Sequence, residues 1–213
     1  VFATTSENDI AYSWSIDTEI GTQSLTGVGN IPLFEADNDT NDPIVAIVTV
    51  TPSNDETDPS LTCEGSSIEF TITVNPTAQV DLVDSLDLCN GDTAVVDFTT
   101  SNGGVDSVTT YSWEITDGDS VFASAALTGA GNINLPVAND TNADLVATVT
   151  VTPTYTNDGV DCTGPSEEFT ITVSPTAQVD QVDDIVVCNG DEVAEIVFAT
   201  TSENDIAYSW SID

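Results

Sequence analysis

The sequence predicts an all-β protein made of tandem β-sandwiches arranged in a rod, and three observations support this prediction. Several runs alternate apolar residues with threonine, which is the period of a half-buried strand. Turn-forming clusters of Asn, Asp and Gly separate these runs, and no stretch has the period of an amphipathic helix. Short strands at a spacing of roughly 8–12 residues are typical of a sandwich.

Strands are expected wherever Val, Ile, Thr, Tyr and Phe are concentrated, because these residues fit a pleated, half-buried surface. The clearest expected strands are residues 95–99, 110–116, 145–152 and 168–173. In the last of these, Phe169, Ile171 and Val173 alternate with threonine and should face the core. Trp14, Trp113 and Trp210 occupy equivalent places, and we expect them to be core residues rather than sugar-stacking surfaces.

The chain repeats itself at two periods. Val1–Asp17 recurs without substitution as Val197–Asp213, so the larger period is 196 residues. Shorter motifs recur inside it, which divides it into two modules of about 98 residues each. We therefore expect a sandwich at 1–76 that lacks its first strand, a complete sandwich at 77–175, and the opening strands of a third at 176–213. On this view the chain is one period of a longer array plus an overlap.

The expected module boundaries contain proline. Pro76 and Pro175 each follow an expected strand, and proline cannot extend a hydrogen-bonded ladder. The linker Thr-Ala-Gln-Val-Asp that follows each proline is short and lacks glycine. This composition favours a stiff rod over a flexible tether.

The charge composition excludes several functions. The chain has 37 acidic residues and no Lys, Arg or His, for a formal net charge of −37. Binding to nucleic acid or to an anionic membrane surface requires cationic side chains, so neither partner is expected. No apolar run is long enough to cross a bilayer. No base is present to activate a Ser or Cys nucleophile, so we do not expect an enzyme. The charge fits cation binding, fibre solubility or a salty habitat.

Four motifs occur in a fixed order along the chain: Cys-Asn-Gly at 89–91, Tyr-Ser-Trp at 111–113, Leu-Thr-Gly-Ala-Gly-Asn-Ile at 127–133, and Val-Thr-Val-Thr-Pro at 149–153. With these motifs the chain resembles PKD-like domains, which are immunoglobulin-like sandwiches found in tandem arrays in cell-surface adhesins of Bacteroidetes. The resemblance implies an extracellular spacer module with no catalytic residues.

The cysteines lie at module-equivalent positions, which predicts structural disulfides and an oxidising compartment. They are Cys63, Cys89, Cys162 and Cys188. One alternative pairs Cys89 with Cys162 inside a module. The other pairs equivalent cysteines across a module junction, because in immunoglobulin order the two loops lie at opposite ends of the sandwich, beyond the Cα separation of roughly 6 Å that a disulfide allows. Both alternatives stay open, and the 196-residue period places the counterpart of Cys188 before Val1.

Carboxylates gather at the two linkers, where Ca²⁺ could collect oxygen ligands between modules. The candidate ligands are Asp81, Asp84, Asp180, Asp183 and Asp184. The alternative is that these residues are solvated acids without a bound ion, because exposed carboxylates are common.

Two kinds of short motif predict glycosylation. Asn38 and Asn139 each begin an Asn-Asp-Thr sequon. A second pattern, a hydroxyl residue after Asp and before an apolar residue, is associated with O-glycans in Bacteroidetes surface proteins. It occurs at Ser85, Thr93, Ser107 and Ser120.

These observations favour a structural repeat of an extracellular fibre or adhesin stalk that spaces or holds cells. Its partners would be identical modules, placed end to end in the same chain or in a neighbouring chain. The matching sequence ends favour one giant chain over joined subunits. The alternative function is a Ca²⁺-dependent or carbohydrate-binding surface module, whose partner would be a surface glycan.

Overall fold

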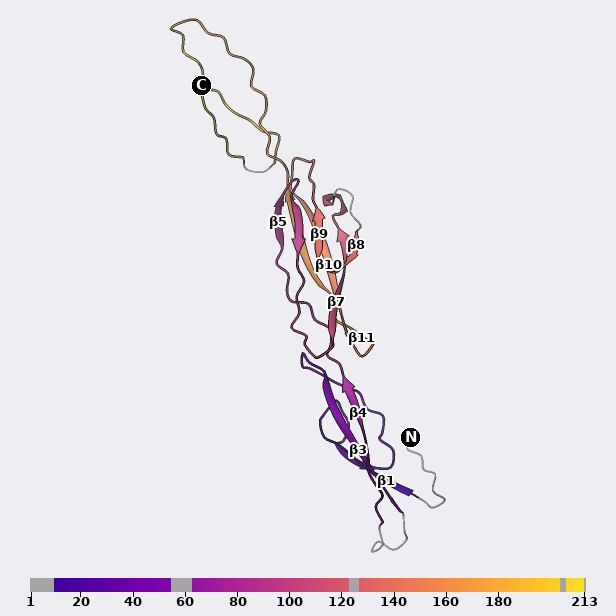
Figure 1. The fold of residues 1–213 in the computed structure, drawn as a ribbon. Helices are drawn as coiled ribbons and strands as arrows, with labels where there is room; N and C mark the ends of the chain where they lie inside the picture. The colour runs from indigo at the N-terminus through magenta and orange to yellow at the C-terminus, as the bar shows by residue number, and fades with distance from the viewer. Residues whose placement is uncertain (1–9, 55–62, 123–126, 204–205, 213) are drawn as a thin grey trace. The chain divides into compact units, whose positions relative to one another are not determined.

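The computed structural model describes residues 10–54, 63–122, 127–203 and 206–212 (Figure 1). The chain forms two compact bodies, and their limits differ from those of the sequence modules. The first body comprises 1–79, 100–110 and 153–165, and the second comprises 80–99, 111–152 and 166–213. Thus two segments of the module at 77–175 pack with the preceding module.

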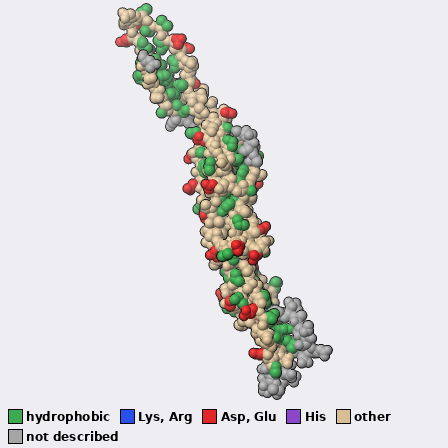
Figure 2. All heavy atoms as spheres, in the orientation of Figure 1, with side chains coloured by type: hydrophobic (Ala, Val, Ile, Leu, Met, Phe, Trp, Pro, Cys, Tyr) green, Lys and Arg blue, Asp and Glu red, His purple; other side chains and the backbone are tan. Residues whose placement is uncertain are grey.

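The secondary structure confirms the predicted all-β class. Every element in the described ranges is a strand, apart from one short 3₁₀ turn, η1, at Asp119–Val121. No helix in these ranges is long and apolar enough to cross a membrane. Figure 2 shows acidic side chains distributed along the surface, and the sequence supplies no Lys or Arg to neutralise them.

The first body contains a four-stranded antiparallel sheet in the order β2-β1-β3-β4. The strands are β1 (Ile10–Ile16), β2 (Thr26–Val28), β3 (Ile44–Asn54) and β4 (Ile68–Val74). Alternate residues of β3, among them Ala46, Val48 and Val50, are buried around Trp14. The period of two predicted from sequence therefore sets which face of β3 forms the core.

The complete module has two layers. Its larger sheet has the order β5-β12-β10-β7-β8, with β11 paired to β10, and its smaller sheet pairs β6 with β9. The bounds are β5 Leu86–Cys89, β6 Thr93–Val96, β7 Val108–Asp117, β8 Thr128–Ala130, β9 Ile133–Pro136, β10 Leu145–Asn157, β11 Val160–Thr163 and β12 Glu167–Ser174. Side chains from both sheets share one buried core, as expected for a β-sandwich.

The expected strands correspond to β6, β7, β10 and β12. β7 and β12 are confirmed with slightly wider bounds, and β10 is confirmed but extends five residues further, to Asn157. The strand expected at 95–99 lies earlier, at 93–96. Pro76 and Pro175 mark strand ends as predicted, because β4 ends at Val74 and β12 ends at Ser174.

Two of the three tryptophans are core residues, as predicted. Trp14 is 5% exposed and Trp113 is 7% exposed. Each lies against a glycine of the neighbouring strand, and a Cβ on Gly27 or Gly129 would come within 2.2 Å of the indole ring.

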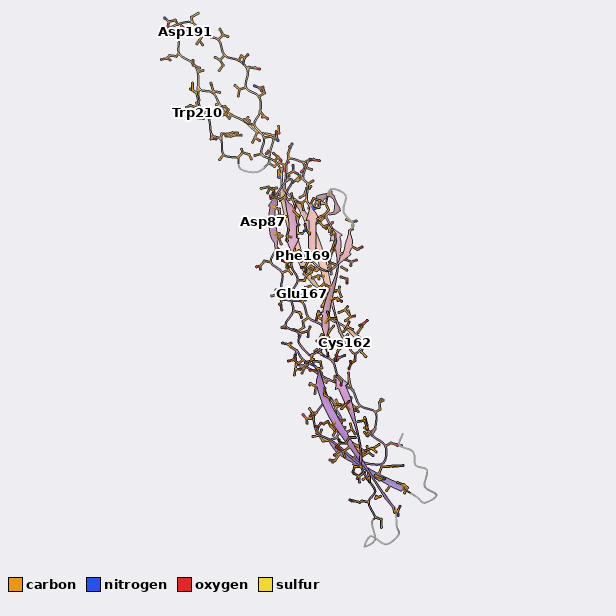
Figure 3. The ribbon with its side chains drawn as sticks, viewed as in Figure 1. Asp87, Cys162, Glu167, Phe169, Asp191 and Trp210 are labelled. Carbon is orange, nitrogen blue, oxygen red and sulfur yellow. The ribbon has the colours of Figure 1, made fainter. Side chains whose placement is uncertain are left out.

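The prediction is wrong for Trp210, which is 72% exposed (Figure 3). The described part of 176–213 contains no strand. The sequence holds only two copies of the Val-Thr-Val-Thr strand against which such a tryptophan packs, and Trp14 and Trp113 already use them.

Candidate functional site

The modules carry matching hydrogen-bonded loops at one end. In the first body, the Nδ2 of Asn38 donates to the carbonyl oxygens of Asp42 at 2.9 Å and Val74 at 2.7 Å. Its Oδ1 accepts bonds from the backbone N–H of Thr40 at 2.9 Å and from the Thr40 hydroxyl at 2.7 Å. One asparagine thus joins the loop before β3 to the end of β4.

Asn139 repeats this arrangement in the second body. Its Nδ2 donates to the carbonyls of Ala143 at 2.7 Å and Val173 at 2.6 Å, and its Oδ1 accepts from Thr141. Asn139 is only 2% exposed. A glycan on Nδ2 would replace one of the two donated protons and would need space that the buried side chain lacks. These bonds argue against glycosylation at Asn139 and give Asn38 the same structural role.

A backbone hydrogen bond recurs just beyond these loops. Within the first body, the N–H of Gly103 donates to the carbonyl of Asn41 at 2.9 Å. Within the second body, the N–H of Glu203 donates to the carbonyl of Asn142 at 2.8 Å. Both acceptors end an Asn-Asp-Thr-Asn run, and both donors lie five residues after a phenylalanine. In both cases, the loop that contains Asn-Asp-Thr-Asn in one module therefore accepts a hydrogen bond from the equivalent backbone N–H of the next module.

Side chains reinforce this contact in the first body. The Nδ2 of Asn157 donates to the Oδ1 of Asn75 at 2.8 Å. The hydroxyl of Tyr155, a residue that is 1% exposed, donates to the carbonyl of Gly103 at 2.8 Å. A side chain on Gly103 would contact Asp42, since an added Cβ would lie 2.4 Å from its carboxylate. Glycine at 103 thus permits this close approach.

The linker after Pro76 is held by the loop at 100–102. The backbone N–H of Gln79 donates to the Oδ1 of Asn102 at 2.6 Å, and the Nδ2 of Asn102 donates to the carbonyl of Thr77 at 3.1 Å. The hydroxyl of Ser101 donates to the Oε1 of Gln79 at 3.0 Å. Sequence analysis predicted a stiff linker but did not identify Asn102, the residue that fixes it.

All four cysteines are free thiols in the structure. Cys162 (labelled in Figure 3) lies on β11, where its partner is Tyr155 of β10, whereas Cys89 ends β5 and is the partner of Ser174 of β12. Val173, next to Ser174, pairs with Leu145 at the other end of β10. Which cysteines pair stays a prediction, with both alternatives open.

The five aspartates suggested as calcium ligands, Asp81, Asp84, Asp180, Asp183 and Asp184, are all exposed. The carboxylate of Asp81 accepts a hydrogen bond of 2.7 Å from the hydroxyl of Thr99. No group of three or more His, Cys, Asp or Glu residues in the described ranges is arranged to hold a metal ion. Calcium binding stays a prediction that rests on the sequence pattern.

The candidate O-glycosylation sites differ in accessibility. Ser85, Thr93 and Ser120 are exposed, although the hydroxyl of Ser85 is 2.9 Å from that of Thr170. Ser107 is half-buried, and its hydroxyl donates to backbone carbonyls of the preceding turn at 3.1 Å. Modification at these positions stays a prediction.

Aromatic residues surround a cavity of about 310 Å³ in the segment after residue 176. Phe198, Tyr208 and Trp210 line it, and the centroids of the first two rings lie 5.8 Å apart. Their counterparts Phe98 and Tyr111 have a centroid separation of 5.4 Å and belong to the core of the complete module. The aromatic residues that line this cavity are therefore counterparts of residues that belong to the core of the complete module.

Comparison with known proteins gives one family match. A family model described as a PKD-like domain matches residues 87–177. The matched segment contains every strand of the complete sandwich except the first residue of β5. No curated protein and no solved structure matches the chain.

Proposed function

We propose that the chain is a structural repeat of an extracellular fibre or adhesin stalk, in which successive PKD-like sandwiches form a stiff array. The observation that carries this proposal is the recurring backbone bond, from Gly103 to Asn41 and from Glu203 to Asn142. A module contact that recurs with the same geometry at two places can propagate along a chain of identical repeats.

Hydrogen bonds inside each module also favour a stiff array. Asn38 and Asn139 use their whole amide groups to fix the loop that receives the next module. The linker at 77–79 is bonded to the loop at 100–102 and is not a free tether. These contacts limit bending where one module meets the next, which suits a spacer.

An extracellular location is supported by composition and by the family match. A net charge of −37 keeps long fibres soluble and apart. The absence of Lys and Arg also removes every site for trypsin-like proteases. Residues 87–177 are similar to a PKD-like domain, a module of the kind that the sequence motifs indicated.

Immunogold electron microscopy of intact source cells tests the location. Antibodies raised against residues 87–177 should label filaments outside the envelope without permeabilisation. Label that appears only after permeabilisation would contradict the proposal.

Denaturing gels run without and with reductant then distinguish a fibre made of one giant chain from a fibre made of joined subunits. A single giant chain keeps its very high mass on reduction, whereas joined subunits collapse to a small band.

A further inference from the structure

Among the described residues, β4 is the edge strand of its sheet and its apolar face is poorly covered. Phe70 is 39% exposed, whereas its counterpart Phe169 on β12 is 4% exposed. Phe169 is less exposed than Phe70 because β5 pairs in parallel with β12 in the complete module, and the leucines of β5 pack against the core. In the described ranges, the outer edge of β4 therefore has no strand of the kind that β12 receives.

The chain itself contains a segment of the matching kind. Ile185–Cys188 reads Ile-Val-Val-Cys and corresponds to Leu86–Cys89, because both segments precede Asn-Gly-Asp. The following turns also match, since the N–H of Cys188 donates to Asp191 as that of Cys89 does to Asp92. Ile185–Cys188 nevertheless forms no strand, and its Val186 is 93% exposed.

We propose that Ile185–Cys188 of one 196-residue repeat adds as a parallel strand to β4 of the following repeat, where its Cys188 forms a disulfide with Cys162. The inference rests on the proposed tandem order of modules. The register comes from the complete module, in which Cys89 is the partner of Ser174. Asn75 is the counterpart of Ser174, so the added Cys188 would lie opposite Asn75.

Cys162 is at the matching place. Asn75 and Cys162 line the same cavity of about 300 Å³, together with Ile72 and Val74 of β4. The bond between Asn157 and Asn75 holds the β10–β11 hairpin, which carries Cys162, against the end of β4. A thiol that arrives beside Asn75 would thus meet Cys162 across this cavity, as the short Cα separation of a disulfide requires.

The reaction is a thiol–disulfide exchange with a small-molecule or protein disulfide as the oxidant. The two cysteine thiols lose two protons and two electrons as their S–S bond forms, and the oxidant is reduced to two thiols. The half-buried Cys162 and the exposed Cys188 are both accessible to such an oxidant. The same rule would pair Cys89 with Cys63 of the following repeat, so that each module is linked to the next.

The test uses a protein in which residues 176–196 are placed directly before Val1 of the full chain. The natural order is preserved, because residue 196 is followed by the same sequence as Val1–Asp17. The substitution Cys188→Ser in the C-terminal copy leaves the added cysteine as the single copy of Cys188 in the test protein. After oxidation in a glutathione buffer, peptide mapping without reduction should show the added cysteine bonded to Cys162, with Cys63 and Cys89 alkylated.

A bond between Cys89 and Cys162, or four alkylated cysteines, would overturn the disulfide. Strand addition is measured separately by hydrogen exchange of residues 68–75, which should slow about tenfold or more relative to the unextended chain. A matched variant with serine in place of the added cysteine should keep this protection. Unchanged exchange would overturn the strand addition. Either failure leaves the extracellular location intact, because that is tested by labelling of cells.

Discussion

The side-chain amide of Asn139 donates to the carbonyl of Val173 at 2.6 Å, inside a loop where Asn139 is almost fully buried. Asn38 makes the equivalent bond to Val74 at 2.7 Å. Both asparagines begin sequons and were predicted as N-glycosylation sites. In the structure their side-chain amides hold the end of a module. The two bonds connect the loop that meets the next module to the strand that leaves the sandwich.

Asn139→Ala should lower the free energy of unfolding by about 3 kcal/mol. The change removes the donor of two short bonds and takes this donor from the buried carbonyl of Val173, whereas the carbonyl of Ala143 keeps the Thr141 hydroxyl. Urea denaturation followed by tryptophan fluorescence measures the loss. The control is Asp140→Ala, which alters an exposed neighbour and should change stability by less than about 0.5 kcal/mol. Equal effects of the two variants would remove the structural role assigned to Asn139.

Gly129→Ala should destabilise the complete module by about 2 kcal/mol. The added methyl group would lie 2.2 Å from Cζ2 of Trp113, so the indole must move inside a packed core. Gly131→Ala in the same hairpin is the control. It has open space but a φ of +72°, and should cost about 1 kcal/mol. Only the Gly129 variant should also shift the tryptophan emission, and an unshifted spectrum would contradict the packing account.

Asn157→Ala should loosen the contact between successive modules without unfolding either one. It removes the 2.8 Å bond to Asn75, whose net worth is about 1 kcal/mol. Hydrogen exchange of residues 72–79 should become several-fold faster, while that of β6 and β9 stays unchanged. Asn134→Ala, at an exposed position of β9, serves as the control. Faster exchange throughout the chain would instead indicate general destabilisation.

Added salt should raise the melting temperature by several degrees. A net charge of −37 with no Lys, Arg or His creates self-repulsion, which salt screens as the Debye length falls from about 30 Å at 0.01 M to about 3 Å at 1 M. Scanning calorimetry with NaCl and CaCl₂ at matched ionic strength separates two effects. Equal increases indicate screening alone, whereas a larger increase with CaCl₂ would support the predicted calcium site. A melting temperature that does not change with NaCl would contradict the screening account.

The sequence was a good guide to what depends on local period and composition. The alternation of Phe169, Ile171 and Val173 identified β12 and its buried face, and the prolines identified strand ends. It was a poor guide to contacts between distant segments. The local sequence around Asn139 does not distinguish a glycosylation sequon from a buried structural amide, because the difference depends on where Val173 lies after folding.

Trp210 shows the same limit in another form. Its motif is that of Trp113, yet it is exposed, because burial depends on strands that a local motif does not contain. The contacts of Asn102 with the linker and of Asn157 with the preceding module were likewise missed, since asparagine in a turn-rich loop is too common to single out. Recurrence at equivalent positions of both modules is the signal that could have found the Asn38 and Asn139 loops.

The central claim is that successive modules are held end to end in a stiff array. Negative-stain electron microscopy of proteins with two and four 196-residue repeats tests it most directly. The account predicts that the end-to-end distance doubles when the number of repeats rises from two to four. Each module should add about 40 Å, since β10 has 13 residues at about 3.3 Å each. A distance that grows only as the square root of repeat number, as for flexibly linked beads, would contradict it.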